Sequence, residues 1–284
     1  MRALVLSGGG VKGAYQLGAL KKWLLEDKRD YDVLCGVSVG ALNVSVLAQA
    51  KLGSIDEAYK KLEALWGTIN DDKVYKKHFF GMLSALWSTS VYSSKPLVDL
   101  ICSTLDVKAV AASGRQVRVG CTSWTTGEYR LAEGTDPDFA KWVAASASFP
   151  VFLEPVEVGG QLWTDGGVRN VTPLATAIEL GADEIDVIMC TNPDVPNPWD
   201  PAGQHAIPGF LERTVDLMSD EIIRADLKVC GLKNDIAERD EKYRKIVVRV
   251  LQPSKKLVSD SLSFDPAVIQ GLIATGYADA CASS

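Results

Sequence analysis

The sequence predicts an α/β fold built on a largely parallel sheet. In the first half of the chain, short apolar runs alternate with amphipathic stretches, which is typical of βαβ units. Two glycine-flanked turns, at 8–13 and 36–40, each stand between an apolar run and a helical pattern. At 284 residues, with 47% hydrophobic side chains, the chain suffices for one large domain or two small ones. We expect one domain over residues 1–284.

The elements of the first half follow from these patterns in order. Residues 3–7 predict a strand, 13–25 a helix and 32–35 a second strand. The next helix, 39–52, is apolar on almost all sides, so we expect it to be buried. Residues 53–110 show a mostly helical pattern and are unusually rich in aromatic side chains.

The middle of the chain alternates between strands and helices. We expect strands at 116–123 and 128–131, a helix at 136–147, a hairpin at 157–164 and a buried strand at 184–190.

The last third of the chain predicts a loop and then a long helix. Residues 192–208 contain five prolines and little periodicity, which is typical of a loop. Apolar side chains at alternating four- and three-residue spacing then mark one face of a helix that Gly231 could interrupt. That face consists of Leu211, Val215, Met218, Ile222, Ala225, Val229, Leu232 and Ile236. It predicts packing against the core or, alternatively, a seam between two copies of the chain. A strand at 245–251 and a helix at 266–280 complete the expected elements.

The charge and the cysteine content narrow the classes of function. A formal net charge of −6 disfavours nucleic-acid binding and strong recruitment to anionic lipid, since both need a basic surface. The six cysteines are dispersed, with no CxxC pair and no Cys/His cluster. We therefore expect free, mostly buried thiols, no metal ion and no other cofactor.

The beginning of the chain and its hydropathy predict a cytoplasmic protein. The apolar run at 3–6 is too short for the apolar region of a secretory signal peptide. No stretch reaches the roughly 18 uninterrupted apolar residues of a membrane-spanning helix. We expect contact with membranes only at their surface.

The segment Gly36-Val37-Ser38-Val39-Gly40 fits the G-x-S-x-G pattern of a nucleophile elbow. Such an elbow projects a serine hydroxyl from a sharp turn between a strand and a helix, and its glycines relieve the crowding there. The expected strand before it and the apolar helix after it provide that context. The helix N-terminus would also stabilise negative charge at Ser38. An ordinary glycine-rich turn fits the pattern as well.

A second glycine-rich turn, GGGVKG, has two interpretations. Gly8, Gly10 and Gly13 match the G-x-G-x-x-G fingerprint of a dinucleotide-binding turn, and Asp30 or Asp32 lies about 20 residues downstream. However, the acidic residue of that fingerprint ends the second strand, whereas both aspartates precede the apolar run here. In the other interpretation, the backbone N–H groups of the turn form an oxyanion hole, since neighbouring strands would bring it beside the serine turn.

Two further segments could contribute to a site. Asp165, Gly166 and Gly167 end the expected hairpin, and a segment of this kind is most often only a turn. The upstream segment ASASFPVFLEP, at 145–155, connects the end of a helix to an apolar loop.

Four segments resemble the patatin-like phospholipase family in order and spacing: GGGVKG (8–13), GVSVGALN (36–43), ASASFPVFLEP (145–155) and DGGVRNVTP (165–173). The end of the chain, 264–280, is similar to the last helix of that family. The resemblance therefore spans nearly the whole chain. It implies a three-layer α/β/α fold with a mostly parallel central sheet, related to that of cytosolic phospholipase A2.

The resemblance also implies an activity and roles for single residues. It implies a serine lipid acyl hydrolase that cleaves carboxylic ester bonds of phospholipids or related acyl lipids through an acyl-enzyme. Ser38 matches the nucleophile of the family, and Asp165 matches the base that takes its proton. The oxyanion hole is implied at Gly8, Gly9 and Gly10, helped by the N–H of Val39. The remaining motif glycines support these turns: Gly13, Gly36, Gly40, Gly166 and Gly167. The implied partners are a lipid ester and, transiently, a membrane or micelle surface.

The histidine content favours a Ser–Asp dyad over a triad. A triad needs a histidine, and the chain has two, His78 and His205. His205 follows Asp165, as the order in α/β-hydrolases requires, but it lies in the proline-rich segment without a supporting motif. His78 stands in a lysine-rich segment that is typical of a surface. We expect Asp165 to be partly buried and within hydrogen-bond distance of Ser38, because burial would raise its pKa from the usual value near 4.

Two segments are candidates for a cap over an acyl pocket. They are the helical region around 55–110, with Phe79, Phe80 and Trp87, and the proline-rich loop 192–208. The aromatic side chains of the first segment could equally belong to the core.

Two cations and two other functions remain open at this point. Lys12 and Arg169 stand near the expected site turns and could steer a phosphate or carboxylate, or be solvated charges. The chain could also be an oxidoreductase that binds a dinucleotide at 8–13, or a lipid-binding module without catalysis. Intact Ser38 and Asp165 weigh against the last of these.

Overall fold

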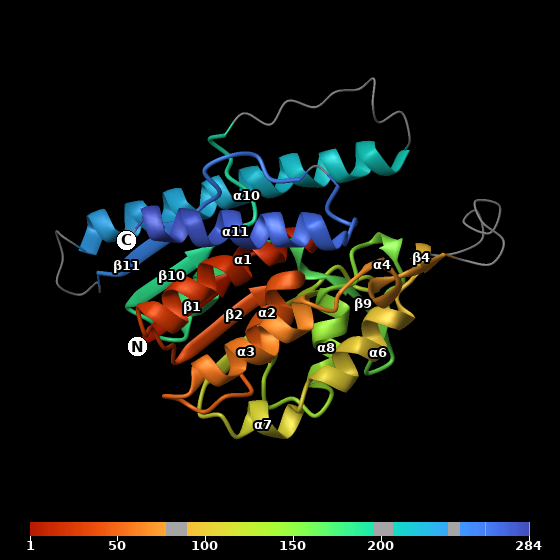
Figure 1. The fold of residues 1–284 in the computed structure, drawn as a ribbon, viewed down its shortest axis with the longest axis horizontal. Helices are drawn as coiled ribbons and strands as arrows, with labels where there is room; N and C mark the ends of the chain where they lie inside the picture. The colour runs from red at the N-terminus through yellow and green to blue at the C-terminus, as the bar shows by residue number, and fades with distance from the viewer. Residues whose placement is uncertain (78–89, 196–206, 238–244, 259, 284) are drawn as a thin grey trace.

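The computed structural model describes residues 1–77, 90–195, 207–237, 245–258 and 260–283 (Figure 1). Its strands are β1 (Arg2–Leu6), β2 (Val33–Val37), β3 (Lys76–Lys77), β4 (Ser90–Ser93), β5 (Gln116–Ser123), β6 (Tyr129–Glu133), β7 (Val151–Leu153), β8 (Val156–Val158), β9 (Gln161–Asp165), β10 (Glu184–Ile188) and β11 (Val247–Leu251). Its α-helices are α1 (Gly13–Leu20), α2 (Val39–Leu47), α3 (Ile55–Trp66), α4 (Asp71–Val74), α6 (Lys95–Thr104), α7 (Val107–Ala111), α8 (Phe139–Ser146), α9 (Leu174–Glu179), α10 (Ile207–Ala237) and α11 (Pro266–Ala282). Short 3-10 helices cover Gly10–Lys12 and Gly166–Val168, and a π-helix, Lys21–Glu26, continues α1.

The central sheet has eight strands and is parallel over much of its width. Its order is β11-β10-β1-β2-β5-β9-β8, and β6 also pairs with β5. The strands from β11 to β5 are parallel, whereas β6, β8 and β9 run antiparallel to their neighbours. A separate three-stranded sheet has the order β3-β4-β7. The predicted, mostly parallel central sheet is therefore confirmed.

Successive side chains of β1 point to opposite faces of the sheet and enter two different hydrophobic clusters. Leu4 and Leu6 pack with side chains of α1, α2, α3, α8 and α11. Ala3 and Val5 pack with side chains of α9 and α10. Helices thus cover both faces of the sheet, which confirms the three-layer α/β/α arrangement.

Helices α1 and α11 lie side by side over one face of the sheet (Figure 1). Glycines allow their close approach. A Cβ on Gly18 would lie 2.0 Å from the carbonyl oxygen of Ile273, and a Cβ on Gly276 would lie 1.9 Å from that of Tyr15. An alanine at either position would push the two helices apart. This contact fixes the C-terminal helix against the helix that follows the first glycine turn.

The first half of the chain differs from the prediction in two places. Helix α2 ends at Leu47 rather than at 52. Strands β3 and β4 occupy a region that was expected to be helical, because they pair with each other and β4 pairs with β7. Strand pairing with a distant segment is not visible in the local pattern of residues.

Helix α10 forms as predicted and continues through Gly231, but three side chains of its expected core face are exposed. Val229 is 50% exposed, Leu232 is 54% exposed, and Ala225 is exposed as well. The side chains of Leu211, Val215, Met218 and Ile236 lie outside the described residues. The predicted packing of this face against the core is therefore wrong for its exposed members, and a seam between two copies stays a prediction.

The opposite side of α10 attaches the helix to the sheet. Cys230 is buried there in the cluster that includes the side chains of α9. Asn234 exchanges two hydrogen bonds with the backbone of Ile246, from Nδ2 to the carbonyl at 2.7 Å and from the N–H to Oδ1 at 3.0 Å. The spacing of apolar residues predicted the helix correctly, whereas these polar contacts decide which side is buried.

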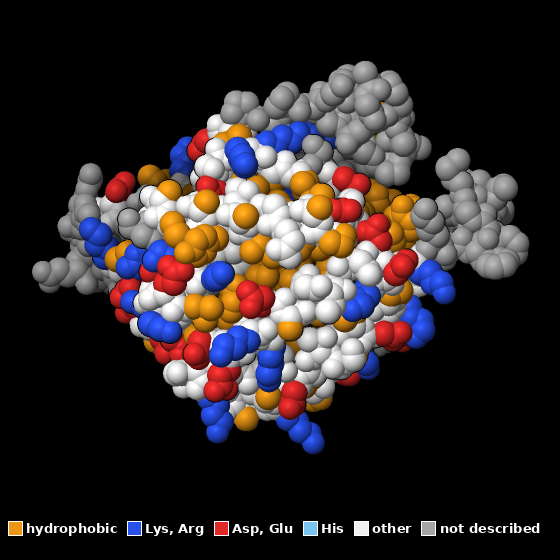
Figure 2. All heavy atoms as spheres, viewed as in Figure 1, with side chains coloured by type: hydrophobic (Ala, Val, Ile, Leu, Met, Phe, Trp, Pro, Cys, Tyr) orange, Lys and Arg blue, Asp and Glu red, His pale blue; other side chains and the backbone are white. Residues whose placement is uncertain are grey.

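The surface in the same view carries Lys and Arg side chains intermixed with Asp and Glu (Figure 2). Apolar side chains lie between these charges, in the middle of the face. None of the helices in the described ranges is both long and apolar enough to cross a bilayer.

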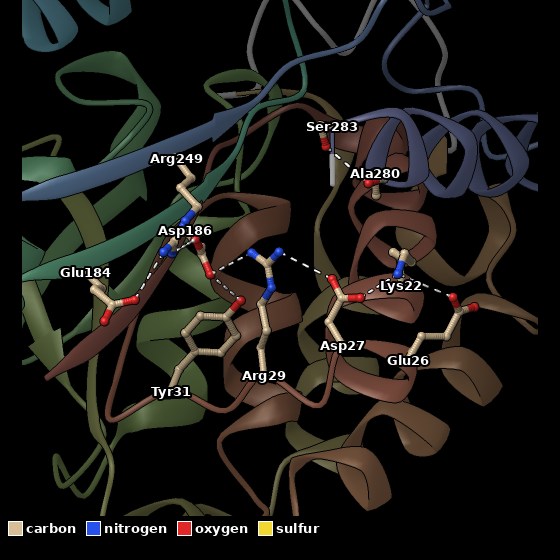
Figure 3. A network of polar contacts seen from close by, with 10 residues as sticks. All are labelled: Lys22, Glu26, Asp27, Arg29, Tyr31, Glu184, Asp186, Arg249, Ala280 and Ser283. Carbon is tan, nitrogen blue, oxygen red and sulfur yellow. Dashed lines mark hydrogen bonds and ion pairs between the residues drawn. The ribbon is translucent and has the colours of Figure 1, made fainter.

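A cluster of ionic contacts joins β10 to β11 and to the segment before β2 (Figure 3). The carboxylate of Asp186, on β10, is fully buried. It accepts hydrogen bonds from Arg29 Nη1 at 3.1 Å, Tyr31 Oη at 3.0 Å and Arg249 Nη1 at 3.1 Å. Arg249 also contacts Glu184 at 3.2 Å. These contacts compensate the charge of a carboxylate that has no access to water.

Candidate active site

Three turns at one end of the central sheet meet at a single pocket. Strands β1 and β2 are parallel and paired, with Leu6 opposite Gly36, so the turns that follow them are neighbours. Asp165, at the end of β9, lies opposite Cys121 of β5, which is the next strand beyond β2. The expected approach of the glycine turn to the serine turn is therefore confirmed.

Ser38 occupies a strained backbone position between β2 and α2. Its φ is 57° and its ψ is −129°, and it is one of three non-glycine residues with positive φ in the described ranges. Gly36 and Gly40 make the turn possible. A Cβ on Gly36 would lie 2.4 Å from the carbonyl oxygen of Gly40, and a Cβ on Gly40 would lie 2.3 Å from that of Leu6. The backbone thus has the conformation that a nucleophile elbow requires.

Asp165 is a buried carboxyl group that lines the same pocket as Ser38, and the hydroxyl of Ser38 acts on its pKa. Its side chain is 1% exposed, and its Oδ1 accepts the N–H of Gly167 at 2.7 Å. Burial raises the pKa of Asp165 from 3.8 to about 7, while the hydrogen bonds from Ser38 and Gly167 act in the opposite direction. No ion pair to Asp165 forms among the described residues. The group therefore changes protonation near neutral pH, beside a serine hydroxyl.

The glycine turn offers two backbone donors to the pocket rather than three. The N–H of Gly8 donates to the carbonyl of Val171 at 3.0 Å, which removes Gly8 from the expected oxyanion donors. The N–H groups of Gly9 and Gly10 have no acceptor within the described ranges, and both residues line the pocket. The N–H of Val39 is the first in α2, where the helix itself provides no acceptor.

Side chains on the glycine turn would collide with their surroundings. A Cβ on Gly8 would lie 3.1 Å from the Cβ of Ser38, so Gly8 lets the two turns approach each other. A Cβ on Gly9 would lie 2.5 Å from the Cβ of Cys190. Gly9 also has a φ of 156°. These contacts explain the glycines without a nucleotide.

The outer side of the turn leaves no room for a dinucleotide. The N–H of Val11 donates to the carbonyl of Ser261 at 2.8 Å, and a Cβ on Gly10 would lie 2.2 Å from the same oxygen. A Cβ on Gly13 would lie 2.2 Å from a methyl group of Val39. A pyrophosphate would need the Val11 N–H that Ser261 accepts and the space that Ser261 and Val39 fill.

A series of buried hydrogen bonds supports the glycine turn. Trp66 Nε1 donates to Asn43 Oδ1 at 3.0 Å, and Asn43 Nδ2 donates to Gln16 Oε1 at 2.9 Å. Gln16 Nε2 donates to the carbonyl of Ser7 at 2.8 Å, and the Ser7 hydroxyl accepts the N–H of Cys190 at 2.9 Å. All five side chains are buried. The series links α3, α2 and α1 to the residue that precedes the three glycines.

Ser38, Asp165 and the glycine turn line a pocket of about 120 Å³. Its apolar walls consist of Val39, Leu42, Trp66, Ile69, Val74, Leu97, Ala147, Phe149, Phe152, Leu153, Val171, Leu262 and Phe264. Four of these residues, at positions 66 to 97, come from the region expected to form a cap. The residues at 261–264 had no expected place near the site, because their segment carries no motif.

The two cations near the site differ in position. Lys12 is 5% exposed and lines the pocket, so it is not a solvated charge. Arg169 is exposed, donates a hydrogen bond to the carbonyl of Gly127, and is not among the residues that line the pocket. Only Lys12 of these two cations can reach a group bound in the pocket.

Several expected site residues lie outside the described residues. They are His78, His205, Phe79, Phe80 and Trp87, together with residues 196–206 of the proline-rich segment.

Three buried polar residues of the site were not predicted. Gln16 and Asn43 belong to the series of hydrogen bonds beneath the glycine turn. Ser146 accepts the N–H of Ser38 at 3.0 Å. Asn43 interrupts a mostly apolar helix, and Ser146 interrupts an alanine-rich helix end. A polar residue in such a segment is the available signal, since buried polar groups need partners.

Comparison with known proteins gives three relationships. A family model described as Patatin-like phospholipase matches residues 4–178. The chain is 21% identical over 261 residues to the uncharacterized protein YjjU of Escherichia coli (strain K12), which covers 90% of this chain and 66% of YjjU. Its fold is similar to the crystal structure of VipD from Legionella pneumophila, with a TM-score of 0.51 and 17% identity over 99% of this chain and 66% of that one. The chain thus spans just under two thirds of the length of both proteins.

Proposed function

The chain belongs to the patatin-like phospholipase family, and we propose that it is a serine lipid acyl hydrolase. In this proposal it cleaves carboxylic ester bonds of phospholipids or related acyl lipids through an acyl-enzyme. Ser38 is the nucleophile, and Asp165 is the base.

One observation carries the proposal. Asp165, a buried carboxyl group whose pKa is raised to about 7, lines the same pocket as a serine in a strained turn, and the hydroxyl of that serine acts on its pKa. An ordinary carboxylate is a weak base for a hydroxyl group, but a base whose pKa lies near the working pH is effective. Burial provides this basicity here, and no histidine is needed to explain it.

The first step forms the acyl-enzyme. Ser38 Oγ attacks the carbonyl carbon of the ester, and its proton passes to Asp165. The carbonyl π electrons move to the oxygen, which is stabilised by the N–H groups of Gly9, Gly10 and Val39 and by the N-terminus of α2. When the tetrahedral intermediate collapses, the C–O bond of the leaving group breaks. The departing alcohol takes the proton from Asp165.

The second step releases the fatty acid. A water molecule gives a proton to Asp165 as its oxygen attacks the acyl carbonyl carbon. The second tetrahedral intermediate collapses with cleavage of its bond to Ser38 Oγ. Asp165 then returns the proton to the serine, and the enzyme is ready for another substrate.

The pocket supports an acyl lipid as the substrate. Its walls are largely apolar, which suits a hydrocarbon chain bound next to the ester. Lys12 is the one cation among the described residues that line it, and we propose that it attracts an anionic group of the lipid, such as a phosphate. The wall residues from α3, α4 and α6 act as a cap that limits the length of the bound chain.

Labelling with a fluorophosphonate probe tests the proposal. The unmodified protein should be labelled and should hydrolyse a p-nitrophenyl ester, whereas Ser38→Ala should do neither. Ser45→Ala is a matched control, because Ser45 is buried in α2, the helix that follows Ser38, and belongs to neither the pocket nor its hydrogen bonds.

Three outcomes would contradict the proposal in different ways. Labelling that survives Ser38→Ala would exclude this nucleophile. Hydrolysis that persists in Asp165→Ala and is lost in His205→Ala would assign the base to the histidine. An unmodified protein without labelling or hydrolysis would favour a lipid-binding module without catalysis.

A further inference from the structure

The C-terminal end of α8 contacts both residues of the proposed dyad. The helix ends at Ser146, and Ser148 follows two residues later. Both serines are fully buried. Neither side chain takes part in the proposed reaction, so their contacts call for another explanation.

Ser146 holds the backbone of Ser38. The N–H of Ser38 donates to Ser146 Oγ at 3.0 Å, and the Ser146 hydroxyl donates to the carbonyl of Gly120 at 2.6 Å. The hydroxyl therefore uses its one donor and an acceptor site, which fixes its orientation. Ser38 has the strained φ of 57°, and such a conformation persists only where the surroundings enforce it. Ser146 provides part of that enforcement.

Ser148 holds the strand that carries Asp165. The carbonyl of Ser148 accepts the N–H of Asp165 at 3.0 Å and the hydroxyl of Thr164 at 2.6 Å. The Ser148 hydroxyl donates a hydrogen bond to the carbonyl of Ala144, one turn earlier in α8, at 2.8 Å. The position of this carbonyl is therefore fixed relative to the helix.

Gly120 lies between the contact that Ser146 makes with Ser38 and the contact that Ser148 makes with Asp165. Its carbonyl oxygen accepts the Ser146 hydroxyl, and a Cβ on Gly166 would lie 2.3 Å from the same oxygen. The residue after Gly120 on β5 is paired with Asp165. The serine turn, the end of α8 and the aspartate turn thus meet around one carbonyl group.

We propose that the end of α8 is a positioning element of the dyad, in which the Ser146 hydroxyl and the Ser148 carbonyl set the separation of Ser38 and Asp165. This inference rests on the proposed function, because it assigns a role in that reaction. Ser146 is a positioning residue and not a catalytic one, since it touches the backbone of the nucleophile and no reacting atom.

Loss of this positioning would alter the pH dependence in a known direction. The hydrogen bond from Ser38 lowers the pKa of Asp165, whereas burial raises it. A weaker hydrogen bond would leave burial less opposed, so the pKa of Asp165 would rise. The Cys121 thiol also faces Asp165, but burial raises its own pKa and keeps it uncharged. Lys12, the other charged residue that lines the pocket, is the same in every variant compared.

The variant Ser146→Ala tests the inference. The kcat for a p-nitrophenyl ester is measured per active site, with the sites counted by fluorophosphonate titration, so that a smaller folded fraction does not affect it. We expect kcat to fall on the order of 10- to 100-fold, as for a displacement of reacting groups by up to an ångström. We expect KM to stay within twofold, and the midpoint of the pH profile to move to higher pH.

Two further variants separate positioning from packing. Ser45→Ala removes another fully buried hydroxyl, which has no hydrogen-bond partner within the described ranges, and should leave kcat and the midpoint unchanged. Ser146→Thr keeps the hydroxyl and should recover part of the kcat that Ser146→Ala loses.

The result decides between the inference and the function on which it rests. A kcat within twofold of the unmodified protein and an unmoved midpoint in Ser146→Ala would overturn the inference alone. Ser146→Thr as slow as Ser146→Ala would also overturn it, because the hydroxyl would then be irrelevant. If the unmodified protein neither binds the probe nor cleaves the ester, the proposed function fails, and the inference fails with it.

Discussion

Asp165 and Asp186 are both buried aspartates of the central sheet, but their surroundings differ. Asp186 is 0% exposed, and its carboxylate accepts hydrogen bonds from Arg29, Arg249 and Tyr31 (Figure 3). Asp165 is 1% exposed and has no cation paired with it in the described ranges. The two aspartates are thus buried to the same extent, but among the described residues cations compensate the negative charge of Asp186 and not that of Asp165.

The comparison shows that partners, rather than burial alone, decide what a buried carboxyl group does. Two guanidinium groups and a phenol satisfy the carboxylate of Asp186, which suits a structural role. Asp165 has the Ser38 hydroxyl and one backbone N–H, and burial raises its pKa to about 7. The ionised form of Asp165 therefore destabilises the folded protein. The same lack of charged partners leaves its carboxylate able to accept a proton from a serine.

The largest expected difference between the two aspartates is in catalysis. Asp165→Asn should lower kcat by about 10²- to 10⁴-fold, because an amide cannot accept the proton of Ser38. Asp186→Asn should keep its kcat per titrated active site. Ester hydrolysis by both variants measures this contrast. A kcat for Asp165→Asn within threefold of the unmodified protein would remove Asp165 as the base.

The second expected difference is in the pH dependence of stability. The pKa of Asp165 is raised on folding, so its contribution to stability is complete below the unfolded value near 4 and is lost as the pH rises through about 7. Asp165→Asn does not titrate. As the pH rises from 4 to 7, the free energy of unfolding of this variant should therefore increase relative to that of the unmodified protein. The increase should be at most about 1.4 kcal/mol per pH unit.

Urea unfolding of both proteins from pH 5 to 9 measures this gain. The difference between the two proteins should widen up to about pH 7 and then stay constant, since the carboxyl group is fully ionised above its pKa. A difference that does not change with pH would show that Asp165 is not an uncompensated buried acid.

The third expected difference is a loss of stability at the compensated aspartate. Asp186→Asn should lower the free energy of unfolding by about 2–3 kcal/mol at pH 7, because two charged hydrogen-bond partners lose their anion. The arginine side chains are 21% and 46% exposed and can regain water, which keeps the loss below that of a fully buried pair. Thermal or urea unfolding checks this value. An unchanged stability would contradict the structural role of the cluster.

Local patterns in the sequence were sufficient for the serine turn. The glycines of GVSVG, the apolar run before it and the apolar helix after it together require a tight turn between a strand and a helix. The structure has that turn at Ser38, with α2 beginning at the next residue. The parallel sheet was predictable for the same reason, since alternating strands and helices allow few other arrangements.

Contacts between distant segments were not predictable in this way. The N–H of Gly8 donates to the carbonyl of Val171, so it is not available as one of the expected oxyanion donors. Gly8 and Val171 are far apart in the sequence. The apolar spacing of α10 predicted a helix but not its buried side, which depends on Asn234 and Ile246. The partners of Asp186 are equally distant, so the sequence could not distinguish it from Asp165.

The most direct test of the central claim is the pH dependence of kcat/KM for ester hydrolysis by the unmodified protein. If Asp165 is the base and its pKa is about 7, kcat/KM should fall about tenfold per pH unit below that value and reach a plateau above it. The residual activity of Asp165→Asn should lack this midpoint. A kcat/KM that stays constant down to pH 5, or the same midpoint in Asp165→Asn, would contradict the account.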